Sequence, residues 1–169
     1  HPFGLLDFYI VHNGEISSYD ANRRYIEMFG YKCTLQTDTE VITYIIDYLV
    51  RKRGLTLKET AHVIAASFWS TIQDKDETAR EQETLLRRMF PSLLITGPFS
   101  IILGYTGGLM TLGDRLKLRS LVCAEKGDIA YMASEESAIR RIQPNPDKVY
   151  SPAGGEPVIY ELYDNESVR

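Results

Sequence analysis

Asn13 and Gly14 are the residue types that can stabilise a negative charge developing on a substrate. They lie in the stretch His12-Asn13-Gly14-Glu15, directly after the apolar run 8–11. Where a buried strand ends in a sharp corner, an asparagine amide and a glycine backbone N–H can both donate hydrogen bonds to one oxyanion. The same Asn-Gly pair is the strongest short signal for a hairpin turn. Taken alone, the dipeptide favours the hairpin.

An acidic residue follows about one helix later. The stretch Thr37-Asp38-Thr39-Glu40 predicts a helix start, with Thr37 as the cap and Glu40 reaching back to the backbone. The helix behind it is expected over 41–50, where isoleucines recur on one face. An acid in a first turn, such as Asp38, favours the helix dipole.

The remaining pattern predicts helices first and strands afterwards. Capping residues predict a helix from Ser17 to Phe29 and another from Thr56, with an apolar face extending to Ile72. The charged stretch 74–90 is either a helix or a surface excursion, and 31–36 is a candidate short strand. Strands are expected over 99–105, 109–112, 118–124, 129–133, around 149 and over 158–162, with a short helix over 134–142. This order indicates an α+β domain with largely antiparallel sheets.

Composition fits one globular domain spanning 1–169. The chain is 44% hydrophobic and 25% charged, with a formal net charge of -4. This mildly acidic balance gives no argument for binding nucleic acid or an anionic membrane, and no apolar run is long enough to span a bilayer. A reduced, cytoplasmic protein is expected, with Cys33 and Cys123 buried and inert. The three histidines lack metal-ligand spacing, and no glycine-rich phosphate loop is present.

Four stretches, taken in order, resemble the class II glutamine amidotransferase domain, which is of the N-terminal-nucleophile hydrolase type. They are the corner 12–16, the helix start 37–40, the segment Asp114-Arg115-Leu116-Lys117-Leu118-Arg119-Ser120-Leu121, and Ala133-Ser134-Glu135. Within the family, 16–19 and 31–40 look most like the glutaminase domain of glutamate synthase-like proteins. The resemblance implies a four-layer α-β-β-α sandwich.

The resemblance also implies a reaction and roles for three residues. Asn13 and Gly14 match the oxyanion hole, and Asp38 matches the carboxylate that binds the α-ammonium group of glutamine. Glutamine would be hydrolysed to glutamate and ammonia, and the ammonia would pass to a synthase domain or subunit. No cofactor or metal is expected in this domain; FMN and iron–sulfur clusters would belong to the synthase partner. The oligomeric state stays open.

Other matched residues are expected to have structural roles. Asp114, Arg115 and Arg119 are interpreted as packing and ion-pair residues. His12 is interpreted as a core residue that supports the turn rather than as a general base.

The sequence also departs from the family pattern. The family nucleophile is an N-terminal cysteine, whereas residue 1 is histidine, and neither cysteine of the chain can replace it. The arginine that binds the substrate carboxylate would fall before His1. We therefore expect a domain without its first strands, inactive as an isolated chain. Lys117 stands where the family has glycine, and Ser120 where it has proline.

Two alternatives remain open at this point. The chain could belong to another class II amidotransferase, such as an amidophosphoribosyltransferase. It could also be a non-catalytic module for glutamine binding or assembly.

Overall fold

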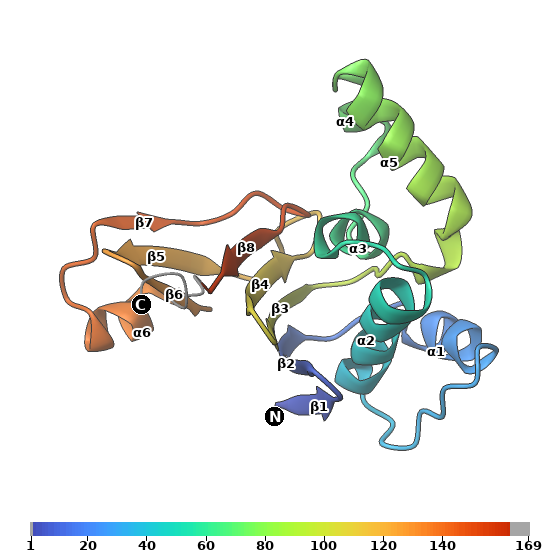
Figure 1. Cartoon of the computed structure of the whole chain (residues 1–169), viewed down its shortest axis with the longest axis horizontal. Helices are drawn as coiled ribbons and strands as arrows, with labels where there is room; N and C mark the ends of the chain where they lie inside the picture. The colour runs from blue at the N-terminus through green and yellow to red at the C-terminus, as the bar shows by residue number, and fades with distance from the viewer. Residues whose placement is uncertain (1, 163–169) are drawn as a thin grey trace, which may run out of the picture.

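The computed structural model describes residues 2–162, which form two antiparallel sheets accompanied by helices (Figure 1). The first sheet has the strand order β1-β2-β3-β4-β8 and the second has the order β6-β5-β7. The strands are β1 (Phe3–Leu5), β2 (Phe8–Gly14), β3 (Phe99–Tyr105), β4 (Gly108–Gly113), β5 (Val122–Lys126), β6 (Ile129–Ala133), β7 (Lys148–Tyr150) and β8 (Val158–Glu161). The helices are α1 (Tyr19–Glu27), α2 (Asp38–Asp47), continued by the π-helix η1 (Tyr48–Lys52), α3 (Leu57–Ile64), α4 (Trp69–Gln73), α5 (Glu77–Met89), the 3-10 turn η2 (Pro91–Leu93) and α6 (Glu136–Ile142).

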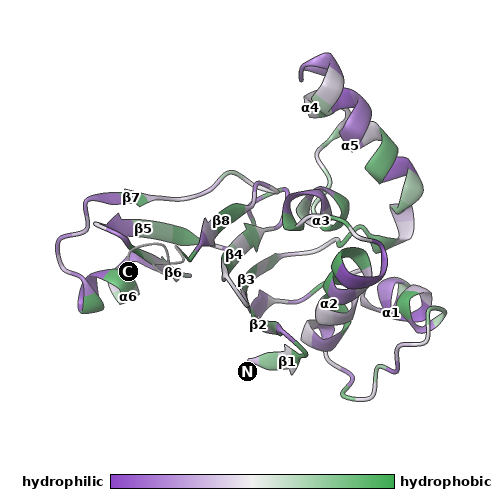
Figure 2. Ribbon diagram, viewed as in Figure 1, coloured by the Kyte–Doolittle hydropathy of each residue, from purple (hydrophilic) through white to green (hydrophobic). Residues whose placement is uncertain are grey.

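The first sheet presents one of its faces to the helices. Residues of a strand alternate between the two faces, so the row formed by Ile10, Leu103, Met110 and Ile159 lies on one side. This row belongs to the main core, together with the isoleucines of α2. Figure 2 shows the hydrophobic side of α2 facing the sheet, while α5 is mostly hydrophilic. Burial of these apolar side chains is the main force that holds the helical layer in place.

The neighbouring row of the first sheet faces the second sheet. It consists of Tyr9, Gly104, Leu109 and Tyr160. The Tyr160 hydroxyl contacts Oε1 of Glu125 at 2.7 Å and the Tyr150 hydroxyl at 2.8 Å, which joins β8 to both β5 and β7. Helix α6 packs on β5 and β6. The domain is therefore mixed α+β, as the sequence pattern predicted.

Several predicted elements differ in extent. The expected helix from Thr56 to Ile72 is divided into α3 and α4, and the intervening Phe68 lies beneath the Arg115 guanidinium at 4.7 Å. The stretch 74–90 forms helix α5, which Asp76 caps by accepting from the Ala79 N–H at 3.0 Å. The candidate strand over 31–36 is an irregular loop, and the strand expected over 118–124 begins only at Val122.

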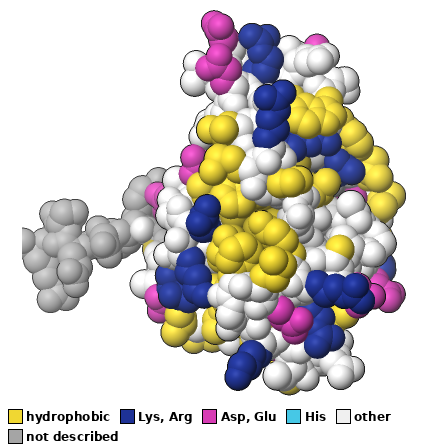
Figure 3. Space-filling model, turned by 90° about the vertical axis from the view of Figure 1, so that its right-hand side faces the viewer, with side chains coloured by type: hydrophobic (Ala, Val, Ile, Leu, Met, Phe, Trp, Pro, Cys, Tyr) yellow, Lys and Arg dark blue, Asp and Glu magenta, His cyan; other side chains and the backbone are white. Residues whose placement is uncertain are grey.

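The helical side of the molecule carries apolar and basic side chains next to one another (Figure 3). Several of the cations lie over aromatic rings: Lys52 over Tyr31 at 4.2 Å and Arg87 over Trp69 at 4.1 Å. Such contacts keep partly exposed rings against long cationic side chains. Within residues 2–162, no helix combines the length and apolarity needed to cross a bilayer.

Asp114 holds residues 116–119 in a loop, which explains why the strand expected from Leu118 begins only at Val122. Its buried carboxylate accepts backbone N–H groups from Leu116 at 3.0 Å, Leu118 at 3.0 Å and Arg119 at 3.3 Å. It also accepts the N–H of Phe99, the first residue of β3, at 3.3 Å. The loop thus closes tightly around one side chain, and the Lys117 backbone is held at φ 56°. The packing role predicted for Asp114 agrees with this geometry.

We predict that Lys117→Gly stabilises the protein by about 1 kcal/mol, because the left-handed region is costly for a residue with a Cβ atom. The Lys117 side chain is exposed, so its loss removes little packing. The matched control is Lys117→Ala, which removes the same side chain but keeps the Cβ atom. Urea unfolding of both variants tests the idea, and equal midpoints for the two would contradict it.

Candidate functional site

Strand β2 ends in a corner that requires glycine. Gly14 has φ 141°, and a Cβ atom placed there would lie 2.1 Å from the carbonyl oxygen of Pro98. The next residue, Glu15, donates its N–H to the same oxygen at 3.0 Å. The chain then continues into α1 and forms no hairpin with a following strand. The hairpin interpretation of Asn13-Gly14 was therefore wrong.

The corner is joined to the segment 92–98 by a chain of polar contacts. Ser17 donates its N–H to the Thr96 carbonyl at 2.8 Å, and Thr96 donates its own N–H to Ser18 Oγ at 2.9 Å. Ser18 Oγ in turn donates to Asn22 Oδ1 at 2.7 Å, and the Asn22 amide donates to the Ser92 carbonyl at 2.8 Å. Ser18 is the N-cap residue of α1 but makes no capping bond with its side chain, because its hydroxyl is used across this junction.

Asp38 lies beside this corner, at the start of α2. Its Oδ1 is 3.3 Å from His12 Nδ1, and its Oδ2 accepts the Ile16 N–H at 3.4 Å. Thr37 caps the helix as predicted, accepting the Glu40 N–H at 3.3 Å. The Asp38 side chain remains 20% exposed, whereas the His12 side chain is 2% exposed. The Asp38 carboxylate is thus held by His12 and Ile16 on one side and partly exposed to solvent on the other.

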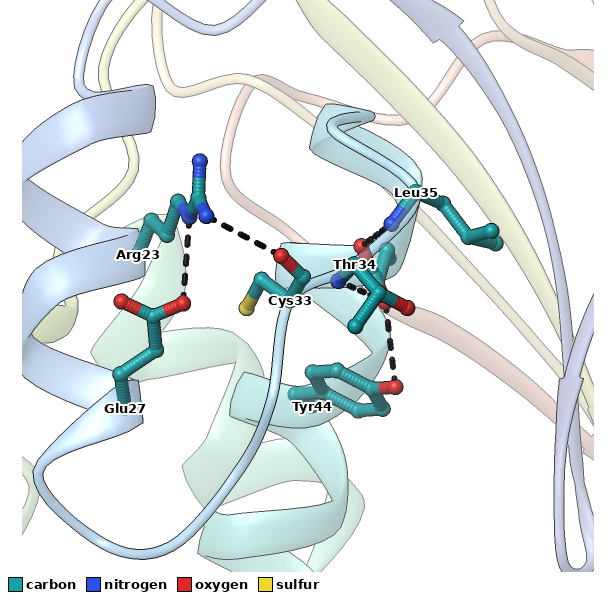
Figure 4. A network of polar contacts seen from close by, with 7 residues as sticks. Arg23, Glu27, Cys33, Thr34, Leu35 and Tyr44 are labelled. Atoms are coloured by element: carbon teal, nitrogen blue, oxygen red, sulfur yellow. Dashed lines mark hydrogen bonds and ion pairs between the residues drawn. The ribbon is translucent and has the colours of Figure 1, made fainter.

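Glu40 holds the loop that leads to Asp38. Figure 4 shows the loop residues Cys33, Thr34 and Leu35, with Arg23 and Tyr44 nearby. It was expected to reach back to the cap residue, but its carboxylate accepts the N–H groups of Thr34 at 3.0 Å and Leu35 at 2.9 Å. The Tyr44 hydroxyl donates to the same carboxylate at 3.2 Å. On the other side of the loop, Arg23 donates to the Cys33 carbonyl at 3.1 Å. The buried Glu40 carboxylate therefore fixes the position of the loop that precedes α2.

Gly14 and Asp38 line one cavity of about 420 Å³. Its other lining residues are Glu15, Ile16, Tyr19, Gln36 and Thr37. Two of these seven residues are acidic and none is basic, so the described wall favours the cationic end of a ligand. Tyr19 and Gln36 were not identified from the sequence, because their own patterns indicate only a helix start and a loop.

Asn13 faces a smaller neighbouring cavity of about 150 Å³. Ser100, which pairs with Asn13 across β2 and β3, lines this cavity, as do Leu121 and Ser134. The sequence stretches 12–16, 114–121 and 133–135 therefore meet here, and 37–40 adjoins them through Asp38. Ser100 lines this cavity because of the register between β2 and β3, which no local sequence motif shows.

Burial favours the neutral form of His12. Burial lowers the pKa of its imidazole below the ordinary value. Asp38 acts in the opposite direction, whereas Arg119 adds to the lowering.

Arg119 and Arg115 make no ion pair with any residue among 2–162, so for these two residues the predicted ion-pair role is not found there. Within the same residues, no group of His, Cys, Asp and Glu side chains could hold a metal ion.

Gly14→Ala should destabilise the protein by about 2–4 kcal/mol, because the new methyl group meets backbone atoms that cannot rotate away. The matched control is Gly113→Ala, where a Cβ atom would meet nothing within 4 Å. We expect the control to stay within about 1 kcal/mol of the native protein. Thermal and urea denaturation provide the measurement, and similar losses in both variants would argue against the corner constraint.

No family model matches the chain. It is 48% identical over 98% of its length to an uncharacterized protein of Archaeoglobus fulgidus, of which it covers 44%. It is 29% identical over 96% of its length to a putative glutamine amidotransferase of Methanothermobacter thermautotrophicus, of which it covers 45%. It is also 29% identical over 80% of its length to the glutamine–fructose-6-phosphate aminotransferase of Aliivibrio fischeri, of which it covers 22%. The chain thus spans less than half the length of these relatives.

Solved structures share the fold. The glutamine phosphoribosylpyrophosphate amidotransferase from B. subtilis matches with a TM-score of 0.59 and 16% identity, covering 95% of this chain and 29% of that one. A glutamine aminotransferase class-II domain protein from Silicibacter pomeroyi matches with a TM-score of 0.52 and 15% identity, covering 96% of this chain and 70% of that one. These named proteins do not support the expected closeness to glutamate synthase in particular. The chain is thus similar in sequence to class II glutamine amidotransferases and has the mixed α+β fold of their glutaminase domains.

Proposed function

We propose that this domain binds glutamine and releases its side-chain amide nitrogen as ammonia, as the glutaminase part of a class II amidotransferase. The observation that carries the proposal is the cavity shared by Gly14 and Asp38. A glycine corner able to bind an oxyanion and a carboxylate able to bind an ammonium group lie on the same wall. Glutamine carries an amide carbonyl at one end and an α-ammonium group at the other, which suits this arrangement.

The proposed reaction begins when a thiolate adds to the side-chain carbonyl carbon of glutamine. The carbonyl π electrons move to oxygen, and the Gly14 N–H stabilises the resulting oxyanion. The second proposed donor is the Asn13 amide, which lines the neighbouring smaller cavity. The C–N bond then breaks, and protonation of the leaving nitrogen gives ammonia. Water hydrolyses the remaining thioester to glutamate and regenerates the thiol. Asp38 holds the α-ammonium group throughout.

The thiols of this chain are unsuited to be the nucleophile. Cys33 and Cys123 are both buried. Burial, followed by nearby carboxylates, raises the pKa of each thiol to about 11. Neither residue lines the cavity of Gly14 and Asp38. We therefore infer that the reacting thiolate comes from polypeptide outside residues 1–169, and that the isolated chain does not hydrolyse glutamine.

The acceptor of the ammonia is a separate question. The similar proteins include a glutamine–fructose-6-phosphate aminotransferase and a glutamine phosphoribosylpyrophosphate amidotransferase. They favour an acceptor other than that of glutamate synthase, and hence a partner domain without the FMN and iron–sulfur clusters expected from the sequence.

We propose the layer order helices, sheet, sheet, helix of the N-terminal-nucleophile hydrolases as the architecture of the domain.

Asp38→Asn should raise the KM for glutamine at least about tenfold in the intact gene product, because a charge-assisted contact with the ammonium group is lost. The effect on kcat should be smaller, since Asp38 does not touch the reacting amide. The control is Asp20→Asn, another first-turn acid, which lies in α1 outside the cavity. Ammonia release measured against glutamine concentration gives both constants. An unchanged KM would refute the role of Asp38, and glutamine binding without turnover would indicate a binding module.

Native Cys33 and Cys123 should react slowly with iodoacetamide at pH 8, because a thiol with a pKa of about 11 is only about one part in a thousand thiolate there. Unfolding in guanidinium should release both residues for rapid labelling. Mass spectrometry of timed samples gives the two rates. Fast labelling of either cysteine in the folded protein would reopen the question of the nucleophile.

A further inference from the structure

The His12 imidazole occupies an unusual position for a core residue. It lies on β2 two residues before Gly14, with its side chain almost fully buried and directed toward α2. Its Nδ1 is 3.3 Å from Asp38 Oδ1 and 3.4 Å from Thr39 Oγ1. Its Nε2 is buried and has no hydrogen-bond partner among the described residues. All polar contacts of the ring are therefore made through one nitrogen.

The proton of the neutral ring belongs on that nitrogen. A carboxylate offers only acceptor atoms, so the contact with Asp38 requires Nδ1 to be the donor. In this tautomer Nε2 carries a lone pair, and leaving it unpaired inside the protein has a cost in stability. The imidazole therefore makes favourable polar contacts only through Nδ1, and both partners of Nδ1, Asp38 and Thr39, lie in the first turn of α2.

We propose that His12 is a positioning residue, which orients the Asp38 carboxylate toward the cavity so that it can receive the α-ammonium group of the substrate. The inference rests on the proposed function. His12 binds Oδ1 while the Ile16 N–H binds Oδ2, so both carboxylate oxygens are held by the stretch 12–16. The same stretch contains Asn13 and Gly14. His12 therefore couples the position of the ammonium site to that of the oxyanion corner.

Two substitutions separate positioning from packing. His12→Leu keeps most of the side-chain volume but removes the donor, and it also removes the unpaired Nε2. His12→Asn is smaller, but its amide places a donor near the position of Nδ1. If His12 serves packing alone, the leucine variant should be the better enzyme. If it positions Asp38, the asparagine variant should be the better enzyme even where the leucine variant is the more stable protein.

The measurement uses the intact gene product, with KM and kcat for glutamine and the unfolding midpoint of each variant. For His12→Leu we expect KM to rise about tenfold with little change in kcat, and for His12→Asn a rise of less than about threefold. A second readout is the inhibition constant of 4-carbamoylbutanoate, which is glutamine without its ammonium group. This constant should be the same in all three proteins, because the inhibitor makes no ion pair with Asp38.

The outcomes are distinguishable. If the native protein does not hydrolyse glutamine, the proposed function fails and this inference falls with it. If the native protein is active and Asp38→Asn raises KM while His12→Leu does not, the function stands and the inference is overturned. Equal weakening of glutamine and 4-carbamoylbutanoate by His12→Leu would show a general disturbance of the cavity and would also overturn it.

Discussion

The contact between Gly14 and the Pro98 carbonyl is the constraint on which the site depends. The backbone of β2 approaches the segment before β3 so closely that no side chain fits between them. Gly97, at φ 102°, makes the reciprocal approach, because a Cβ atom there would lie 2.7 Å from the Ser17 nitrogen. Two glycines thus allow two chain segments to touch, and the hydrogen bonds from Glu15 and Ser17 close the junction. The corner is consequently a fixed part of the sheet rather than a flexible turn.

Polar contacts connect the corner to the Asp38 carboxylate and hold it in place. Ile16 and His12 reach Asp38 directly, and Glu40 secures the loop before it by accepting two backbone N–H groups. The first turn of α2 therefore carries two carboxylates with different duties. Glu40 is 1% exposed and all its contacts serve the fold, whereas Asp38 faces the cavity. The difference in exposure separates Asp38, the proposed ligand-binding residue, from Glu40, which supports the fold.

The sequence analysis was correct for elements whose bounds are set by residues close together in the chain. The bounds of β3 and β6 and the capping box of Thr56 and Glu59 agree with the sequence analysis, because strand alternation and first-turn hydrogen bonds involve near neighbours. The failures involve side chains whose partners are distant. Ser18 and Glu40 have the types of capping residues, yet both bind backbone groups elsewhere. Asp114 likewise binds the N–H groups of Leu118 and Arg119, which the sequence pattern had placed in a strand. The candidate site was anticipated at Asn13, Gly14 and Asp38 through a resemblance, while Ser100, Tyr19 and Gln36 required the tertiary structure.

The charges around the cavity indicate which parts of the proposed glutamine site this domain supplies. A free amino acid presents an ammonium and a carboxylate group on the same carbon atom. The described wall offers Asp38 and Glu15 to the first group, and no lysine or arginine to the second. For the proposed glutamine site, recognition of the α-carboxylate requires a cation from outside this wall, and the proposed reaction requires a thiolate that Cys33 and Cys123 do not provide. Both requirements concern the same cavity, so the polypeptide that brings the nucleophile is also the natural source of the cation. On this view the domain contributes the oxyanion corner and the ammonium site, and a second segment contributes the groups that react with and enclose the substrate.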